Sequence, residues 1–357
     1  MSRRALRRMA TVAVVILAGT MLAACSSSDD SSGKSGGSDT SGSVSFPLTI
    51  TDASGQKLTL DKKPTKIGCY WTGCDEILAS LGVVPYASPN VADTTRGSLV
   101  YPDGEPTKDI SKLGGEDNAE SWAKAGVDLI VTRGPASPEV KAFEQVAPVL
   151  YLYAPGLDDS ANLSGLDAYK KNVEIMGQVT GKVSEATAAV KGFDTFMTKL
   201  ASAAPADAAT TTVAPIFQTD DGSYQLIAPT SPFCVALEEY KIGKCVQSSA
   251  RNASTWVING EAFLALDPNW IPYMGGEDNS QLDWKRRSDA IWNKLTAVKE
   301  KHVYNSTSRI FCCSLRTLAP AIQEYAYHVW GPTSGVADPG KINDYAYTDD
   351  YSPLASD

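Results

Sequence analysis

The sequence predicts an α/β fold in which two lobes with mainly parallel sheets are joined by a long helix. Short strand patterns alternate with helix patterns over residues 64–153, and the alternation returns over residues 212–304. Such alternation is typical of βαβ units, in which a helix connects neighbouring parallel strands. Between the two regions, residues 166–201 place apolar side chains mostly at helical spacing, which favours a connecting helix.

Composition excludes several classes of protein. The 357 residues, 43% hydrophobic and 8% aromatic, can bury a large core and allow about two domains. A formal net charge of −9 argues against a nucleic-acid partner, since phosphate binding needs a basic surface. The chain has two histidines, and no Gly-x-Ser-x-Gly elbow joins a predicted strand to a helix, so no enzymatic activity is expected.

The first 25 residues have the pattern of a lipoprotein signal peptide. Four arginines within the first eight residues precede an apolar run from Met9 to Ala24. The run indicates a secretion signal, with a permanent membrane anchor as the alternative. Leu22-Ala-Ala-Cys25 resembles the bacterial lipobox, in which the Cys thiol receives a diacylglycerol and the peptide is cut before it. Cys25 is therefore the expected lipidation site, which would hold the mature chain on the outer face of the cell membrane.

A tether is expected between this signal and the globular body. Residues 26–45 are mostly Ser, Gly and Asp, which cannot form a packed core. Removal of the signal takes away four arginines and no acidic residue, so the formal charge falls from −9 to −13. This charge fits solubility outside the cell and identifies no ligand.

The N-terminal lobe is expected over residues 46–165. Two alternating runs flank Asp52–Gly55, which predicts a β-hairpin over residues 46–60. Gly82 is expected to end the first helix. The pattern then predicts strands at 64–71, 83–87, 127–132 and 149–153, and helices at 75–81, 119–125 and 138–146.

The connecting helix, residues 166–201, is interrupted by three glycines and can be one helix or two in succession. The C-terminal lobe is expected over residues 202–357. The segment Glu120–Ile130 pairs with Glu261–Ile271 as a repeat, since each is Glu, a helical turn and then a strand at the same spacing. The C-terminal pattern predicts strands at 212–218, 270–273 and 302–304, and helices at 234–240, 261–266, 290–295 and 317–330.

Three segments carry a resemblance to a known family. Pro64-Thr-Lys-Ile-Gly through Asp75-Glu-Ile-Leu-Ala-Ser-Leu-Gly82 looks like the first strand and helix of substrate-binding proteins that serve ABC importers of iron-siderophores and vitamin B12. Residues 126–148 and 291–304 are similar to two later landmarks of that family. The resemblance implies two Rossmann-like lobes bridged by a rigid helix, with the ligand in the cleft between them.

The resemblance also implies a function. A lipid-anchored extracytoplasmic monomer would capture a ferric siderophore and deliver it to an ABC importer permease. No cofactor and no protein-held metal are expected, because iron would arrive already chelated. The alternatives are a binding protein for vitamin B12 or haem, an enzyme on the same frame, and a cell-surface protein that kept the fold without transport.

Ligand-contact residues are expected where strands end, because ligands of α/β lobes bind at the carboxyl ends of strands. Arginines offer planar donors to siderophore oxygens, and aromatic rings offer broad apolar contact. Trp71 and Tyr273 can instead be core residues, and Arg96, in a segment that resembles the ferrichrome-type binders, can instead be a surface charge. The candidates are Tyr70, Trp71, Arg96, Arg133, Arg251, Asn252, Tyr273, Arg309 and Phe311.

The family docks onto its permease through one surface glutamate on each lobe, and the matching positions are Glu120 and Glu261. Exposed charges of this kind steer association and fix orientation. The alternative is a solvated glutamate at a helix start, stabilised by the helix dipole.

Six cysteines remain once Cys25 is assigned to lipid, and an even number outside the cell favours disulfides. The spacing contains no zinc or iron–sulfur pattern. Sequence proximity suggests the pairs Cys69 with Cys74, Cys234 with Cys245, and Cys312 with Cys313. In an alternative arrangement, Cys312 or Cys313 bonds across to Cys234.

Overall fold

In the computed structural model the fold lies within one compact unit, Ser41–Asp357. All statements below concern the residues that the structure describes. These are 44–90, 113, 118–134, 138–155, 163–218, 223–246, 255–274, 290–306 and 313–337.

The predicted N-terminal hairpin is present. Strands β1 (Leu48–Thr51) and β2 (Lys57–Leu60) pair antiparallel, with Leu48 opposite Leu60. The Asp52 carboxylate closes the turn, because its Oδ1 accepts hydrogen bonds from the backbone N–H groups of Ser54 (2.9 Å) and Gln56 (3.2 Å). The backbone N–H of Ala53 donates to the Tyr151 carbonyl at 2.9 Å, which joins the hairpin to the first sheet.

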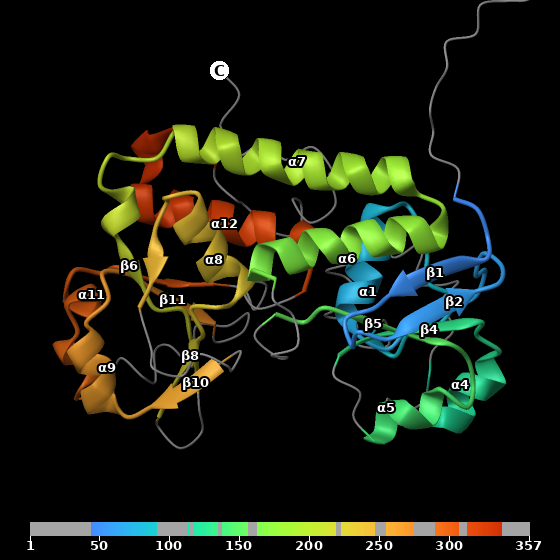
Figure 1. The fold of residues 1–357 in the computed structure, drawn as a ribbon. Coiled ribbons are helices and arrows are strands. Elements are labelled where there is room, and N and C mark those ends of the chain that lie inside the picture. The colour runs from blue at the N-terminus through green and yellow to red at the C-terminus, as the bar shows by residue number, and fades with distance from the viewer. Residues whose placement is uncertain are drawn as a thin grey trace, which may run out of the picture. The chain divides into compact units, whose positions relative to one another are not determined.

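The first sheet has the order β3-β4-β5 and is parallel throughout, as predicted. Its strands β4 and β5 are labelled in Figure 1. The expected strand at 83–87 is reduced to one bridge between Ala87 and Gly68, because Pro85 lies inside it and lacks the N–H that a ladder needs. This region contains β3 (Ile67–Cys69), α1 (Thr72–Ser80), α4 (Ala119–Ala125), β4 (Leu129–Arg133), α5 (Pro138–Phe143) and β5 (Val149–Leu152).

The connecting segment forms two helices, α6 (Gly165–Thr180) and α7 (Val183–Ser202). The break lies at Gly181, whose φ of 66° is a left-handed conformation that ends a helix and favours glycine. The chain then turns back, so that α7 lies beside α6 in Figure 1. Gly177 permits this close approach, because a Cβ there would overlap the Ala186 methyl group.

The second sheet has the order β10-β8-β7-β11-β12. Strands β7, β11 and β12 are parallel, whereas β8 and β10 pair antiparallel and were not predicted. The predicted strand 212–218 is divided at Ala214-Pro215, and its first part pairs with a short strand, β9. The strands are β6 (Thr212–Val213), β7 (Ile216–Gln218), β8 (Tyr224–Ile227), β9 (Lys244–Cys245), β10 (Thr255–Ile258), β11 (Ile271–Met274) and β12 (Val303–Asn305).

Three α-helices predicted after residue 230 are present, whereas the helix expected at 290–295 is only a single 3-10 turn followed by a short helix. That short helix begins where the Asp267 carboxylate accepts hydrogen bonds from Thr296 N (2.9 Å) and Oγ1 (2.7 Å). The helical elements are α8 (Pro232–Glu239), α9 (Gly260–Leu266), η3 (Trp292–Lys294), α11 (Thr296–Lys299) and α12 (Leu315–Trp330).

One core cluster joins the two halves of the sequence. It contains Ile77 of α1, Phe193 of α7 and Ile322 of α12, all fully buried. Two smaller clusters lie against single sheets, around Trp122 in the first half and Trp292 in the second. In the part of the chain that the structure describes, no helix is both long enough and apolar enough to cross a membrane.

Candidate binding site at the strand ends

Three neighbouring parallel strands end at one edge of the first sheet. Tyr70 and Trp71 follow β3, Arg133 is the last residue of β4, and Tyr153 follows β5. Arg133 is exposed, and the three aromatic residues are half-buried. The sheet therefore brings together three of the predicted ligand residues at the edge where α/β proteins bind ligands.

The loop that carries Tyr70 and Trp71 is closed by the predicted disulfide between Cys69 and Cys74. The Trp71 ring lies over Gly73, where any Cβ would overlap it. The Tyr70 ring meets the Phe143 ring edge-on, with the ring centroids 5.0 Å apart. Each aromatic side chain is thus held by packing on one side and remains partly accessible.

Tyr153 is a site candidate that the sequence reasoning missed. The side chain of Asn172, fully buried on α6, accepts a hydrogen bond from Tyr153 N (2.9 Å) and donates one to Tyr153 O (2.8 Å). The backbone at the end of β5 is therefore fixed by the connecting helix. The strand-end rule that selected Tyr70 and Arg133 also selects Tyr153, once it is applied to the strand at 149–153.

In the second half of the chain, the buried side chains of Ser306 and Glu324 meet where β12 ends. Ser306 Oγ donates to Glu324 Oε2 at 2.6 Å, and Ser306 N donates to the Tyr273 carbonyl at 2.7 Å. Glu324 and Arg316, both on α12, are 5% and 8% exposed. The sequence predicted α12 but did not single out these charged residues, because an acidic or basic residue on a helix ordinarily faces solvent.

Tyr273 occupies the core. Its side chain is fully buried, and its ring meets Trp292 edge-on with the ring centroids 6.3 Å apart. Burial raises the pKa of Tyr273 to about 12, so the phenol stays neutral. This placement favours the core alternative over the ligand contact expected from the sequence. Arg96, Arg251, Asn252, Arg309 and Phe311 lie outside the described residues.

Two adjacent buried carboxyl groups, Asp75 and Glu76, lie near the start of α1. Asp75 is 1% exposed, and its Oδ2 accepts a hydrogen bond from Asn90 Nδ2 at 2.9 Å. Burial raises the pKa of Asp75 to about 7, against the hydrogen bonds of Asn90 and Ser88. Glu76 is 4% exposed, and its Oε2 accepts hydrogen bonds from Thr317 Oγ1 (2.9 Å) and Cys313 N (3.2 Å).

The second predicted disulfide, between Cys234 and Cys245, is also present and joins α8 to β9. Cys313 is disulfide-bonded as well, and Cys234 is not its partner, which excludes a bond between these two. Cys25 and Cys312 lie outside the described residues. Among the described residues, no group of three or more His, Cys, Asp and Glu side chains could hold a metal ion.

Glu120 and Glu261 occupy matching positions in the two halves. Both are exposed, and each lies in the first turn of a seven-residue helix, α4 or α9. The side chains of Asn118 and Asn259 cap the two helices. The predicted repeat is therefore present in the structure, and each glutamate lies at the positive end of a helix dipole.

The repeat extends into the following strands. Asp128 Oδ2 accepts hydrogen bonds from Thr65 N (2.9 Å) and Oγ1 (3.0 Å), just before β4. Asn269 Oδ1 accepts from Thr212 N (2.8 Å) and Oγ1 (2.8 Å), just before β11. The same hydrogen-bond arrangement therefore joins the amino ends of neighbouring strands in both halves.

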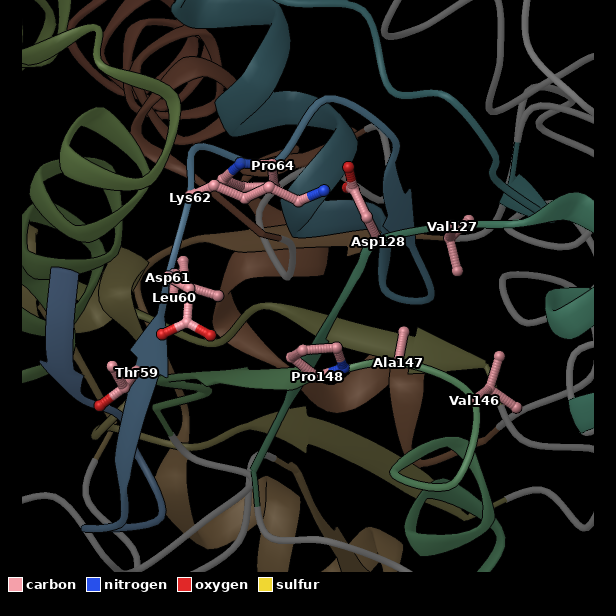
Figure 2. Close-up of a pocket in the computed structure, with 10 residues that line it drawn as sticks. All are labelled: Thr59, Leu60, Asp61, Lys62, Pro64, Val127, Asp128, Val146, Ala147 and Pro148. Carbon is pink, nitrogen blue, oxygen red and sulfur yellow. The ribbon is translucent and has the colours of Figure 1, made fainter. Parts of the chain in front are cut away.

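A pocket of about 340 Å³ lies at the amino ends of the first sheet (Figure 2). The Asp128 carboxylate already accepts the hydrogen bonds of Thr65 and Lys66 there. The pocket lies at the edge of the sheet opposite Tyr70 and Arg133, so it is separate from the strand-end site. Its lining residues are Thr59, Leu60, Asp61, Lys62, Pro64, Val127, Asp128, Val146, Ala147 and Pro148.

Two α/β halves connected through helices, with aromatic and arginine side chains at the strand ends, define a protein of the two-lobed ligand-binding class. The periplasmic binding protein family matches residues 132–310, half of the chain, and the chain belongs to this family. The family consists of binding proteins for transport, in agreement with the expectation that the chain is not an enzyme.

Individual relatives agree with this assignment. The uncharacterized ABC transporter substrate-binding lipoprotein YvrC of Bacillus subtilis is 24% identical over 304 residues, 81% of this chain and 87% of that protein. The triscatecholate siderophore binding protein FeuA of Bacillus subtilis, complexed with ferri-bacillibactin, has a TM-score of 0.66 at 14% identity, covering 80% of this chain and 99% of FeuA.

A further solved structure has the same fold. Staphylococcus aureus SirA, complexed with staphyloferrin B, has a TM-score of 0.62 at 16% identity, covering 79% of this chain and 98% of SirA. At these identities the structural likeness establishes the two-lobed fold, as predicted.

Proposed function

We propose that this protein is an extracytoplasmic solute-binding protein that captures a ferric siderophore and delivers it to an ABC importer permease. The observation that carries the proposal is the group of Tyr70, Trp71, Arg133 and Tyr153 at the carboxyl edge of the first sheet. The siderophore complexes of FeuA and SirA support the choice of ligand class.

The side chains suit such a ligand. The exposed guanidinium of Arg133 offers several planar N–H donors to the anionic oxygens around chelated iron. The half-buried rings of Tyr70, Trp71 and Tyr153 offer rigid apolar contact to the organic frame. In this proposal iron is part of the cargo, and the protein itself holds no cofactor.

The remaining parts of the proposal concern placement and partners. The lobes are residues 46–165 and 202–357, connected by 166–201, and a lipid on Cys25 holds the monomer at the membrane through the tether 26–45. The name of the YvrC relative, a substrate-binding lipoprotein, supports this location. Glu120 and Glu261, exposed at matching helix starts, are the contacts to the permease.

Tryptophan fluorescence tests the ligand class. The mature chain, started at Ser26 so that it carries no lipid, is titrated with ferric hydroxamate, catecholate and carboxylate siderophores. Saturable quenching by one of these classes, with no turnover of the ligand, is expected because Trp71 lies at the site. Vitamin B12, haem and iron-free siderophores serve as controls. An absence of response to all three ferric classes would refute the proposal.

A further inference from the structure

The adjacent carboxyl groups of Asp75 and Glu76 contact two segments that are distant from each other in the chain. Asp75 holds Asn90, 15 residues away in the sequence. Glu76 holds Cys313 and Thr317, 237 and 241 residues away. Asp75 lies in the first turn of α1 and Glu76 directly after it, next to the disulfide-closed loop that carries Tyr70 and Trp71.

The side chains that make these contacts are buried. Asp75, Glu76 and Thr317 are each at most 5% exposed, and Asn90 is 8% exposed. Asp75 Oδ1 is buried and has no hydrogen-bond partner among the described residues. Burying two neighbouring acids costs free energy that apolar side chains at these positions would not cost. Packing of the hydrophobic core therefore does not explain why two acids occupy these positions.

We propose that Asp75 and Glu76 are positioning residues of the ligand site, which fix Asn90 and the start of α12 relative to the Tyr70–Trp71 loop. The part that concerns ligand affinity rests on the proposed function. Glu76 acts through Cys313 and Thr317, and Asp75 acts through Asn90. Because both acids lie on one helical turn, a shift of α1 moves the aromatic loop and both anchored segments together.

The groups around the pair agree with these roles. Glu76 Oε2 accepts two hydrogen bonds, an arrangement that stabilises a carboxylate. Burial raises the pKa of Asp75 and of Tyr169 on α6, and the nearby Glu76 adds to both shifts, so Tyr169 stays neutral. On α12, the helix that carries Thr317, two further charged residues are buried, Arg316 and Glu324.

Hydrogen–deuterium exchange of the ligand-free mature chain tests the positioning directly. Glu76→Ala is expected to speed exchange of the Cys313 amide by roughly tenfold or more, because the amide loses one of its two acceptors and Thr317 Oγ1, the other acceptor, loses the carboxyl group that holds it. Residues 88–90 should be unchanged. Asp75→Ala is expected to speed exchange at residues 88–90 and to leave the Cys313 amide unchanged. Glu76→Gln and Asp75→Asn keep an acceptor oxygen and are expected to restore slow exchange. Glu174→Ala, at an exposed position on α6, is the matched control.

The donor side provides variants that leave both acids in place. Thr317→Val removes one donor to Glu76 and also the Oγ1 that accepts from Cys313 N at 3.1 Å. Asn90→Leu removes the donor to Asp75. Each variant should therefore speed exchange only on its own side. Siderophore affinity should fall by about tenfold or more in the alanine variants and recover within about threefold in the conservative ones. If hydrogen exchange is unchanged in Glu76→Ala, Asp75→Ala, Thr317→Val and Asn90→Leu, the positioning role is overturned. If the unaltered chain binds no siderophore, the proposed function fails, while the exchange measurement still decides the positioning.

Discussion

Asp75→Asn should change how the stability of the protein depends on pH. Burial raises the pKa of Asp75 from 3.8 to about 7 in the folded protein, and the unfolded chain should keep the ordinary value. Between these two values the folded state binds a proton that the unfolded state has released, so the free energy of unfolding falls as the pH rises. At 1.36 kcal/mol for each pH unit, the loss from pH 4 to pH 7 is roughly 4 kcal/mol.

An asparagine at this position cannot titrate and keeps an oxygen that can accept from Asn90. The stability of Asp75→Asn relative to the unaltered chain should therefore rise by roughly 4 kcal/mol between pH 4 and pH 8. Urea unfolding at several pH values, with the disulfides intact, measures this difference, and Glu174→Gln controls for exposed carboxylates. A difference that stays flat from pH 4 to pH 8 would refute the burial of an ionisable Asp75.

Three further results are expected. Arg133→Ala should weaken siderophore binding by about tenfold or more, since a hydrogen bond to a charged group is worth about 1.5–3 kcal/mol; fluorescence titration measures it, and unchanged affinity would remove Arg133 from the site. Glu120→Gln combined with Glu261→Gln should leave siderophore affinity unchanged and reduce uptake by cells, and intact uptake would argue against docking. Asn172→Ala leaves the partly buried backbone groups of Tyr153 without their partners and should lower the free energy of unfolding by about 2–4 kcal/mol; a smaller loss in urea unfolding would mean that water replaces the side chain.

The sequence predicted those elements whose signals are local. The helix expected at 119–125 has these bounds in the structure, because Asn118 caps its start and Gly126, at φ 70°, ends it. The hairpin follows from the Asp52–Gly55 turn, and the disulfides Cys69–Cys74 and Cys234–Cys245 follow from proximity in the chain. The repeat of Glu120 in Glu261 could likewise be found from residue spacing alone.

Other elements depend on partners far away in the chain. Strands β8 and β10 have four residues each, and β8 pairs with β10 on one side and with β7 on the other, so neither carries a strong signal of its own. Tyr273 was selected because it follows the strand-end rule, yet its strand directs that side chain into the core beside Trp292.

The sequence by itself determined the α/β class, the two lobes, the helical connection and the strand ends that carry Tyr70, Trp71 and Arg133. Only the tertiary structure decided that Asp75 and Glu76 are buried. A charged pair at a helix start ordinarily faces solvent, and its burial requires Thr317, 241 residues from Glu76, to pack against the same turn. Capping and spacing act between near neighbours in the chain, whereas the desolvation of a charge depends on every segment that the fold places around it.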